Sequence, residues 1–320
     1  MVKDILRILP ASVRQLIQTL PTEVLVELEE IRIRVQKPLE VIWNGRSEFI
    51  TPSGKLTSHS EEGFKVNPED CIKLMNLISN HSLYTLEEEL KRGYITIPGG
   101  HRIGISGKVI LQGGGIHHIK EITSFNIRFA REKVGAASKL LPYLFENRSL
   151  RSTLIISPPQ CGKTTLLRDL VRQLSYGSIE RHISSYKIGL VDERSEIAGC
   201  VMGIPQKDVG PRTDVLDGCP KAEGMMMMIR SMSPDILVAD EIGRKEDVYA
   251  LQEALHAGVK ILTTAHGTDI DEVARRPTLS QMIQQRFFER YVILSRKKGP
   301  GTIHAVYDDQ FRSLLKEIVQ

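Results

Sequence analysis

Residues 157–165, Ser-Pro-Pro-Gln-Cys-Gly-Lys-Thr-Thr, constrain the fold of this chain more than any other stretch. They follow the apolar run 154–156 and precede residues 166–171, whose apolar positions have helical spacing. A strand, a loop ending in Gly-Lys-Thr and a helix form the context in which a phosphate-loop pattern has a physical basis. The backbone N–H groups of such a loop curl around a phosphate, and the positive end of the helix dipole points at the same anion. The sequence therefore predicts a nucleoside-triphosphate site.

Two side chains of this loop have expected roles in binding ATP and Mg²⁺. Lys163 can reach the β- and γ-phosphates, and the hydroxyl of Thr164 can ligate Mg²⁺. Ser157 stands where the pattern usually has its first glycine, and serine is small enough to begin the turn. The predicted nucleotide-binding residues are Ser157, Pro158, Pro159, Gln160, Cys161, Gly162, Lys163, Thr164 and Thr165.

Polar residues also follow three other predicted strands, and open parallel sheets bind ligands at the carboxyl ends of their strands. Asp240 and Glu241 follow an apolar strand in a Walker B pattern. Asp240 is expected to hold the Mg²⁺ shell, and Glu241 to orient and deprotonate the attacking water. Glu193 is a second candidate for positioning that water, and His266 can sense the γ-phosphate by hydrogen bonding. The alternative interpretation is that the acids are solvent-facing residues at strand ends and that His266 is an ordinary loop histidine.

The chain divides at about residue 130 by its secondary-structure pattern. Residues 1–130 combine helices with alternating strands, including a hairpin at Asn44-Gly45, and predict a smaller α+β domain. Residues 131–320 alternate strands with helices. This second pattern predicts an α/β phosphate-loop NTPase domain with a parallel sheet.

Four local expectations accompany this division. We expect one helix over residues 136–145, before the phosphate-loop strand, and another over residues 311–318. Residues 199–220 are rich in Gly and Pro and are expected to form a long loop, which inside a compact domain is usually functional. His117 and His118 follow a triple glycine without metal ligands at suitable spacing, so we expect them in a solvated loop.

Composition limits the class of protein. The 320 residues are 41% hydrophobic and 26% charged, as in ordinary globular proteins. Residues 1–130 hold 16 Lys and Arg against 15 Asp and Glu, and the remainder holds 27 against 24, so neither part is a basic module of the kind that nucleic-acid binding favours. The four cysteines lack metal-ligand spacing and indicate reduced cytosolic thiols. No apolar stretch approaches the roughly 18 residues of a spanning helix, so we expect a cytosolic chain without direct membrane insertion.

Several motifs resemble those of the type II/IV secretion ATPases. Residues 230–244 resemble their Walker B region, residues 264–267 their histidine box and Asp192-Glu193-Arg194 their aspartate box. Secretion ATPases commonly end Walker B with Gly-Glu, whereas this chain has Asp-Glu, closer to AAA-type ATPases. The choice of base between Glu193 and Glu241 therefore stays open. Further segments resemble the stage III sporulation protein AA family, over nearly the whole chain: residues 99–104, 125–128 and 208–218.

The resemblance implies a RecA-like ATPase domain that follows the smaller N-terminal domain in the sequence. It also implies that six copies of the chain assemble as a hexameric ring. It implies an ATPase in the mother-cell cytoplasm of endospore-forming bacteria, which uses ATP and Mg²⁺ to energise a secretion-like membrane channel. It also implies that N-terminal arginines complete the site, and Arg102 and Arg128 stand on strands that resemble those carrying them. For both, a solvent-facing salt bridge is the alternative. Arg194, Arg212 and Arg244 are the candidates next to motifs in the ATPase domain.

Two other functions stay open at this point. A nucleic-acid-dependent translocase or nucleic-acid-binding ATPase could use the same core. The balanced charge and only 5% aromatic residues argue against it, because single-strand grooves combine basic residues with stacking platforms. A small-molecule kinase is disfavoured by the strand ends at Asp192 and His266 and by the sizeable N-terminal domain. The resemblance implies export-complex proteins and further copies of the chain as partners, whereas the composition disfavours nucleic acid.

Overall fold

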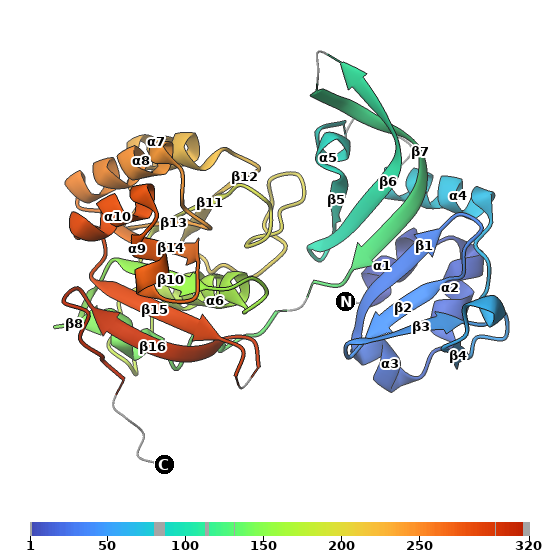
Figure 1. Ribbon diagram of the computed structural model, residues 1–320, viewed down its shortest axis with the longest axis horizontal. Helices are drawn as coiled ribbons and strands as arrows, with labels where there is room; N and C mark the ends of the chain where they lie inside the picture. Colours follow the sequence, from blue (N-terminus) through green and yellow to red (C-terminus); the bar gives the residue numbers. More distant parts are fainter. Residues whose placement is uncertain (1, 80–86, 113–114, 131, 298, 316–320) are drawn as a thin grey trace. The chain divides into compact units, whose positions relative to one another are not determined.

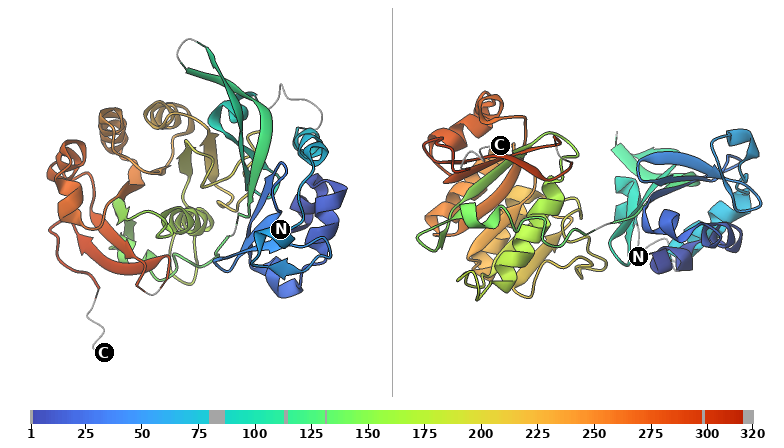
Figure 2. Two further views of the ribbon diagram at one scale, coloured as in Figure 1. Left: turned by 45° about the vertical axis from the view of Figure 1, so that its right-hand side comes forward. Right: turned by 90° about the horizontal axis from the view of Figure 1, so that it is seen from below.

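The computed structural model describes residues 2–79, 87–112, 115–130, 132–297 and 299–315. The chain forms two compact units, Met1–Arg131 and Glu132–Gln320, here called unit 1 and unit 2 (Figure 1; Figure 2). The described residues form one apolar core in unit 1 and two in unit 2. Of the helices formed by the described residues, none is both long and apolar enough to span a membrane.

Unit 1 is built on an antiparallel sheet of seven strands in the order β4-β3-β2-β1-β7-β6-β5 (Figure 1). The strands are β1 Leu28–Arg34, β2 Glu40–Trp43, β3 Arg46–Ile50, β4 Leu56–Thr57, β5 Tyr94–Ile97, β6 His101–Gln112 and β7 Gly115–Arg128. The helices are α1 Val2–Ile8, α2 Ala11–Gln18, α3 Thr22–Val26, the 3₁₀ helix η1 Ser60–Glu62, α4 Pro68–Ile78 and α5 Glu87–Arg92.

Two features of this sheet test local expectations. The hairpin prediction is confirmed, because β2 and β3 pair around Asn44 and Gly45, whose φ angles of 46° and 72° are those a type I′ turn requires. The expected loop at His117 and His118 is wrong, because β7 runs through both. His118 pairs with Ile110 of β6. The partner strand supplies a ladder of backbone hydrogen bonds that no short-range pattern indicates.

Unit 2 is built on a sheet in the order β12-β11-β13-β14-β10-β15-β16, in which only the β15–β16 pair is antiparallel. The strands are β10 Thr153–Ser157, β11 Ile188–Asp192, β12 Thr213–Asp217, β13 Ile236–Ala239, β14 Lys260–His266, β15 Arg290–Ser295 and β16 Thr302–Asp308, with a small hairpin of β8 Phe145–Glu146 and β9 Ser149–Leu150. The helices are η3 Leu141–Leu144, α6 Lys163–Tyr176, α7 Lys221–Met232, α8 Lys245–His256, α9 Ile270–Ala274 and α10 Pro277–Gln284.

Alternate residues of the central strands pack into two different cores. Ile155 of β10 belongs to the core that contains α6, whereas Leu154 and Ile156 belong to the core that contains α7, α8 and α10. Helices therefore cover both faces of the sheet (Figure 1; Figure 2). Because both faces are buried, these strands read as continuous apolar runs in the sequence. The parallel strands bring their carboxyl ends to one edge of the sheet.

The helix expected over residues 136–145 is wrong. The segment consists of turns, and only η3 near its end is helical. Pro142 has no N–H to donate within an α-helix. The N–H groups of Gly135 and Ala137 donate instead to the buried carboxylate of Asp169, at 3.1 and 2.8 Å. The start of unit 2 is thereby fastened to α6, the helix that follows the phosphate loop.

The loop expected over residues 199–220 contains a strand, β12. Its residues pair with β11 from Thr213 opposite Ile188 to Asp217 opposite Asp192. None of the β12 side chains is fully buried, because the strand lies at the edge of the sheet. It therefore lacks the apolar run that marks the central strands.

The helix expected over residues 311–318 is not formed by residues 311–315. The Asp308 carboxylate accepts from the N–H groups of Gln310 and Arg312, each at 2.9 Å, and from Nε of Arg312 at 2.7 Å. These side-chain hydrogen bonds hold the backbone in a turn that competes with a helix. Residues 316–318 lie outside the described residues.

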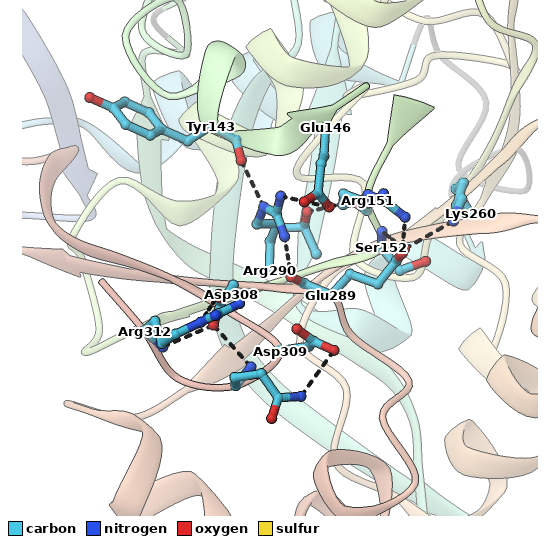
Figure 3. Close-up of polar contacts among 12 residues, drawn as sticks. Tyr143, Glu146, Arg151, Ser152, Lys260, Glu289, Arg290, Asp308, Asp309 and Arg312 are labelled. Atoms are coloured by element: carbon cyan, nitrogen blue, oxygen red, sulfur yellow. Dashed lines mark hydrogen bonds and ion pairs between the residues drawn. The ribbon is translucent and has the colours of Figure 1, made fainter. Parts of the chain in front are cut away.

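A network of charged side chains joins the amino ends of β10, β14 and β15 (Figure 3). The carboxylate of Glu289 accepts from Nη1 of Arg151 at 2.6 Å, from the N–H of Ser152 at 3.0 Å and from Nζ of Lys260 at 2.9 Å. Burial raises the pKa of Glu289, but these three donors outweigh burial and hold the pKa below its usual value. Glu289, just before β15, thus accepts hydrogen bonds from residues at the amino ends of both β10 and β14.

We expect Glu289→Ala to lower the free energy of unfolding by about 2–3 kcal/mol at pH 7, because three donors lose a charged acceptor. The folded-state pKa of Glu289 is lowered. Its stabilisation is therefore fully present above the unfolded value of about 4.3 and is lost as the pH falls through the lowered value. Urea unfolding at pH 7 and below pH 4 measures both effects.

The control for this prediction is Asp309→Asn, which changes a nearby carboxylate outside the network of Glu289 (Figure 3). It should change the free energy of unfolding by no more than about 0.5 kcal/mol. A loss in Glu289→Ala that is the same at both pH values would contradict the assignment of the stabilisation to the carboxylate charge.

Candidate functional site

The carboxyl edge of the unit 2 sheet gathers the residues that the sequence motifs single out. Ser157, at the end of β10, pairs in register with His266 at the end of β14. Ala239, just before Asp240, pairs with Val191 at the end of β11. The phosphate loop and the ends of β11, β13 and β14 therefore meet at one edge, where open parallel sheets bind ligands.

The phosphate loop has the backbone shape of an anion-binding turn. Gln160 and Gly162 have φ angles of 57° and 81°, and Gly162 caps the N-terminus of α6. Left-handed residues of this kind turn successive N–H groups toward one concave side. Ser157 ends β10 in extended backbone, so glycine is not required there. Lys163 donates from Nζ to the carbonyl of Ser157 at 3.2 Å, and an ammonium group has three donors in all.

Residues between β15 and β16 support the phosphate loop. Arg296 donates from Nε and Nη2 to the carbonyl of Gln160, at 3.1 and 2.8 Å. The N–H of Gly301 donates to the carbonyl of Cys161 at 2.8 Å. The side chain of Cys161 is buried in the core with α6, so it packs the loop against the sheet. Arg296 carries no sequence signal, because it approaches the loop only through the pairing of β10 with β15.

A chain of hydrogen bonds runs from the phosphate loop to β14. The hydroxyl of Thr164 donates to Oδ2 of Asp240 at 3.4 Å, and the hydroxyl of Thr264 donates to Oδ1 of Asp240. The N–H of Glu241 donates to Oγ1 of Thr264 at 2.9 Å. Hydroxyl and carboxylate oxygens are the ligands that Mg²⁺ prefers in proteins. The structure thus brings together the two residues predicted to hold the metal.

The two candidate acids each have a cationic partner. Oε2 of Glu241 lies 3.2 Å from Nη1 of Arg194, and this pair is exposed. Oε2 of Glu193 lies 2.8 Å from Nζ of Lys221, whose side chain is only 9% exposed. Burial raises the pKa of Glu193, but Lys221, with Arg244 and Arg194, outweighs burial and holds the pKa below its usual value. Glu241 has a φ of 50°, a conformation that is uncommon outside glycine and clusters at functional sites.

These residues line a cavity of about 390 Å³ at the ends of β11, β13 and β14. The lining residues are Glu193, Arg194, Lys221, Glu241, Ile242, Gly243, Arg244, His266 and Arg276. Four of them carry a positive side chain and two a negative one, so the cavity has an excess of positive charge. A cavity of this kind attracts anions.

Asp192 has its carboxylate inside the turn that follows β11. The residue is 2% exposed, and its carboxylate accepts from the N–H groups of Glu196, Ile197 and Ala198, at 2.9, 2.9 and 2.8 Å. Burial raises the pKa of Asp192 above its usual value despite these donors. Arg168 of α6 donates to the carbonyls of the same turn. Asp192 therefore shapes the turn, whereas its neighbour Glu193 faces the cavity.

His266 lines the cavity and is anchored through its backbone. Its carbonyl accepts from Nη1 of Arg276 at 2.6 Å, and Arg276 also pairs with Glu272 at 2.6 Å. Sequence reasoning singled out neither Lys221 nor Arg276, because no motif contains them. Arg212, one of the arginines next to a motif, donates to Ser185 and does not line the cavity.

Arg102 and Arg128 lie side by side in unit 1, because they pair in register across β6 and β7. The guanidinium carbon of Arg102 lies 3.6 Å from the ring centre of Tyr94. Nε of Arg128 lies 3.5 Å from Oε1 of Glu30. The salt bridge considered as the alternative for Arg128 is thus formed within its own sheet.

The chain matches one protein family over almost its whole length. Residues 2–314 match the family described as "Sporulation stage III, protein AA". The chain is 50% identical over 305 residues to stage III sporulation protein AA of Bacillus subtilis (strain 168). The alignment covers 95% of this chain and 94% of that protein.

Solved structures share the fold at low sequence identity. The ATPase DotB of Legionella pneumophila has a TM-score of 0.56 and 16% identity, over 88% of this chain and 74% of that one. The pilus retraction motor PilT with bound ADP has a TM-score of 0.56 and 17% identity, and the match covers 84% of this chain and 75% of PilT. At such identities the likeness shows the fold alone, and it confirms the predicted RecA-like α/β class. The chain shares its fold with the ATPase DotB and the pilus retraction motor PilT, and it belongs to the stage III sporulation protein AA family.

Proposed function

We propose that this chain is a Mg²⁺-dependent ATPase that energises a secretion-like channel complex during endospore formation. The observation that carries the proposal is the hydrogen-bond chain Thr164–Asp240–Thr264, which joins the phosphate loop to the strand end that bears Glu241. Family membership and the fold shared with secretion ATPases add support.

The residues at this edge fit a nucleoside triphosphate with Mg²⁺. The loop N–H groups and the N-terminus of α6 offer contacts to phosphate oxygens, and Lys163 offers a mobile positive charge. The Thr164 hydroxyl and the Asp240 carboxylate, 3.4 Å apart, would hold Mg²⁺ together with water. Bound Mg²⁺ would neutralise charge that develops on the phosphates.

The environments of the two acids suggest different roles. Glu241 pairs with Arg194 at the surface, where solvent weakens the attraction, so its carboxylate is available to orient water and take a proton. Glu193 is held by the enclosed Lys221, and we assign it to positioning. We assign His266, at the end of β14, to contact with the γ-phosphate.

We extend the proposal to assembly and location. The chain would form a hexameric ring in the mother-cell cytoplasm and would meet the membrane through proteins of the export channel. The support is the family and the motif resemblance to secretion ATPases. A mass measurement in solution with and without ATP and Mg²⁺ tests the ring, and stimulation of turnover by single-stranded DNA or RNA would favour a translocase instead.

Lys163→Ala should weaken ATP binding at least about 30-fold, because loss of a charge-assisted contact to phosphate costs about 2–3 kcal/mol. Titration with a fluorescent ATP analogue measures the affinity. Lys187→Ala is the control, because this lysine donates to the carbonyl of Ser233 before β13, at the opposite edge of the sheet. Equal affinities in wild type and Lys163→Ala would remove the basis of the nucleotide site.

Glu241→Gln should bind ATP normally and hydrolyse it at least about a hundredfold more slowly, because the amide keeps the shape but cannot accept the proton. Glu193→Gln is the matched variant and should retain more activity, since an amide can still accept a hydrogen bond from Lys221. Steady-state phosphate release measures both. An inactive Glu193→Gln beside a near-normal Glu241→Gln would reverse the two roles.

We also propose that Arg102, Arg128 or both complete the site in the assembled ATPase. A supplied arginine balances charge on the γ-phosphate in the transition state and is worth about 10³–10⁵ in rate. Arg102→Ala and Arg128→Ala should therefore bind ATP nearly normally and hydrolyse it poorly. The control is Arg46→Ala, which removes an arginine over the Trp43 ring in the same unit. Normal ATP turnover in both test variants would contradict a catalytic role for these two arginines of unit 1.

A further inference from the structure

Lys221 is the most enclosed of the four cations that line the cavity. Its side chain is 9% exposed, against 64% for Arg194 and 40% for Arg276, while Arg244 is also exposed. A lysine is rarely this buried unless its charge is paired, and Lys221 pairs with Glu193 at 2.8 Å. It is the first residue of α7, so the helix fixes its backbone at the rim of the cavity. The enclosure singles this lysine out from the surface charges.

The charges of the cavity leave room for a further anion. Glu193 is matched by Lys221, Glu241 by Arg194 and Arg276 by Glu272, so Arg244 adds one further positive charge. The cavity therefore keeps a net positive charge that favours a bound anion. Lysine suits a site where partners change, because its ammonium is a compact charge on a flexible stem with three rotatable donors.

We propose that Lys221 reads the terminal phosphate of bound ATP, exchanging its partner Glu193 for a γ-phosphate oxygen and returning to Glu193 when ADP remains. The inference rests on the proposed ATPase function. A terminal phosphate carries more negative charge than one carboxylate, and the exchange takes place in a site partly shielded from water, where charge–charge attraction is strong. Arg244 and Arg194 line the same cavity and stay as cationic neighbours of Glu193 when Lys221 turns to the γ-phosphate.

The position of Lys221 supports this exchange. The cavity that it lines also contains Glu241 and His266, the residues assigned to the water and to the γ-phosphate. Glu193 follows β11, the immediate neighbour of β13, and adjacent strands lie about 4.8 Å apart. Lys221 pairs with Glu193 at 2.8 Å, and the cavity that they line extends to His266, which pairs in register with Ser157 at the start of the phosphate loop.

The test compares ATP binding with ADP binding by the full chain. Lys221→Met keeps the length of the stem without the charge. Its ATP affinity should fall by about tenfold to a hundredfold, and its ADP affinity should stay within about threefold. Lys221→Arg keeps the charge and should retain most of the preference for ATP. Lys187→Met is the control, because Lys187 pairs with Asp235 at the opposite ends of the same strands, and it should leave both affinities unchanged.

A double variant guards against unfolding. Lys221→Met leaves Glu193 enclosed without its partner, which destabilises a fold strongly, whereas Glu193→Gln/Lys221→Met removes both charges. The double variant should also have lost the preference for ATP. Equal losses of ATP and ADP affinity, or an unchanged ratio of the two in a folded variant, would overturn the role of Lys221 while the ATPase proposal stands. A wild-type chain that binds neither nucleotide would end the ATPase proposal and this inference with it.

Discussion

The two oxygens of Asp240 hold the candidate site together. One accepts from Thr164 on the phosphate-loop helix and the other from Thr264 on β14. Thr264 also accepts from the N–H of Glu241, whose backbone is left-handed and therefore needs such support. Three elements that are distant in the sequence thus depend on one carboxylate. Its position follows from the parallel register, which sets the end of β13 beside β14.

The amino and carboxyl ends of the parallel strands in unit 2 differ in their balance of charge. At the amino edge, Glu289 is surrounded by Arg151, Ser152 and Lys260, and the charges are matched within the fold. At the carboxyl edge, positive side chains outnumber negative ones in the cavity. The helices α6, α7 and α8 also begin there, and the positive ends of their dipoles add to the same field. The attraction of anions to the carboxyl ends of the strands therefore results from the parallel topology as well as from the side chains.

Patterns within a few residues of one another made much of the molecule predictable. The hairpin at Asn44 and Gly45, the strand–loop–helix around Gly162 and the apolar strand before Asp240 all form as expected. Each depends on a local requirement: a positive φ, a helix N-terminus or an apolar run. The helix expected over residues 136–145 is wrong because Pro142 has no N–H to donate, while the N–H of Ala137 donates to a carboxylate on α6 that lies 32 residues away in the sequence.

The sequence alone determined which residues form the phosphate loop and which polar residues follow each strand, because both are patterns of contiguous residues. Only the tertiary structure decided which side chains meet the candidate acids. Lys221 reaches Glu193, and Arg296 reaches Gln160, through the packing of α7 and the pairing of β15 with β10. Contacts of this kind join residues far apart in the chain, so no spacing rule contains them. They arise when the whole sheet brings its strand ends to one edge.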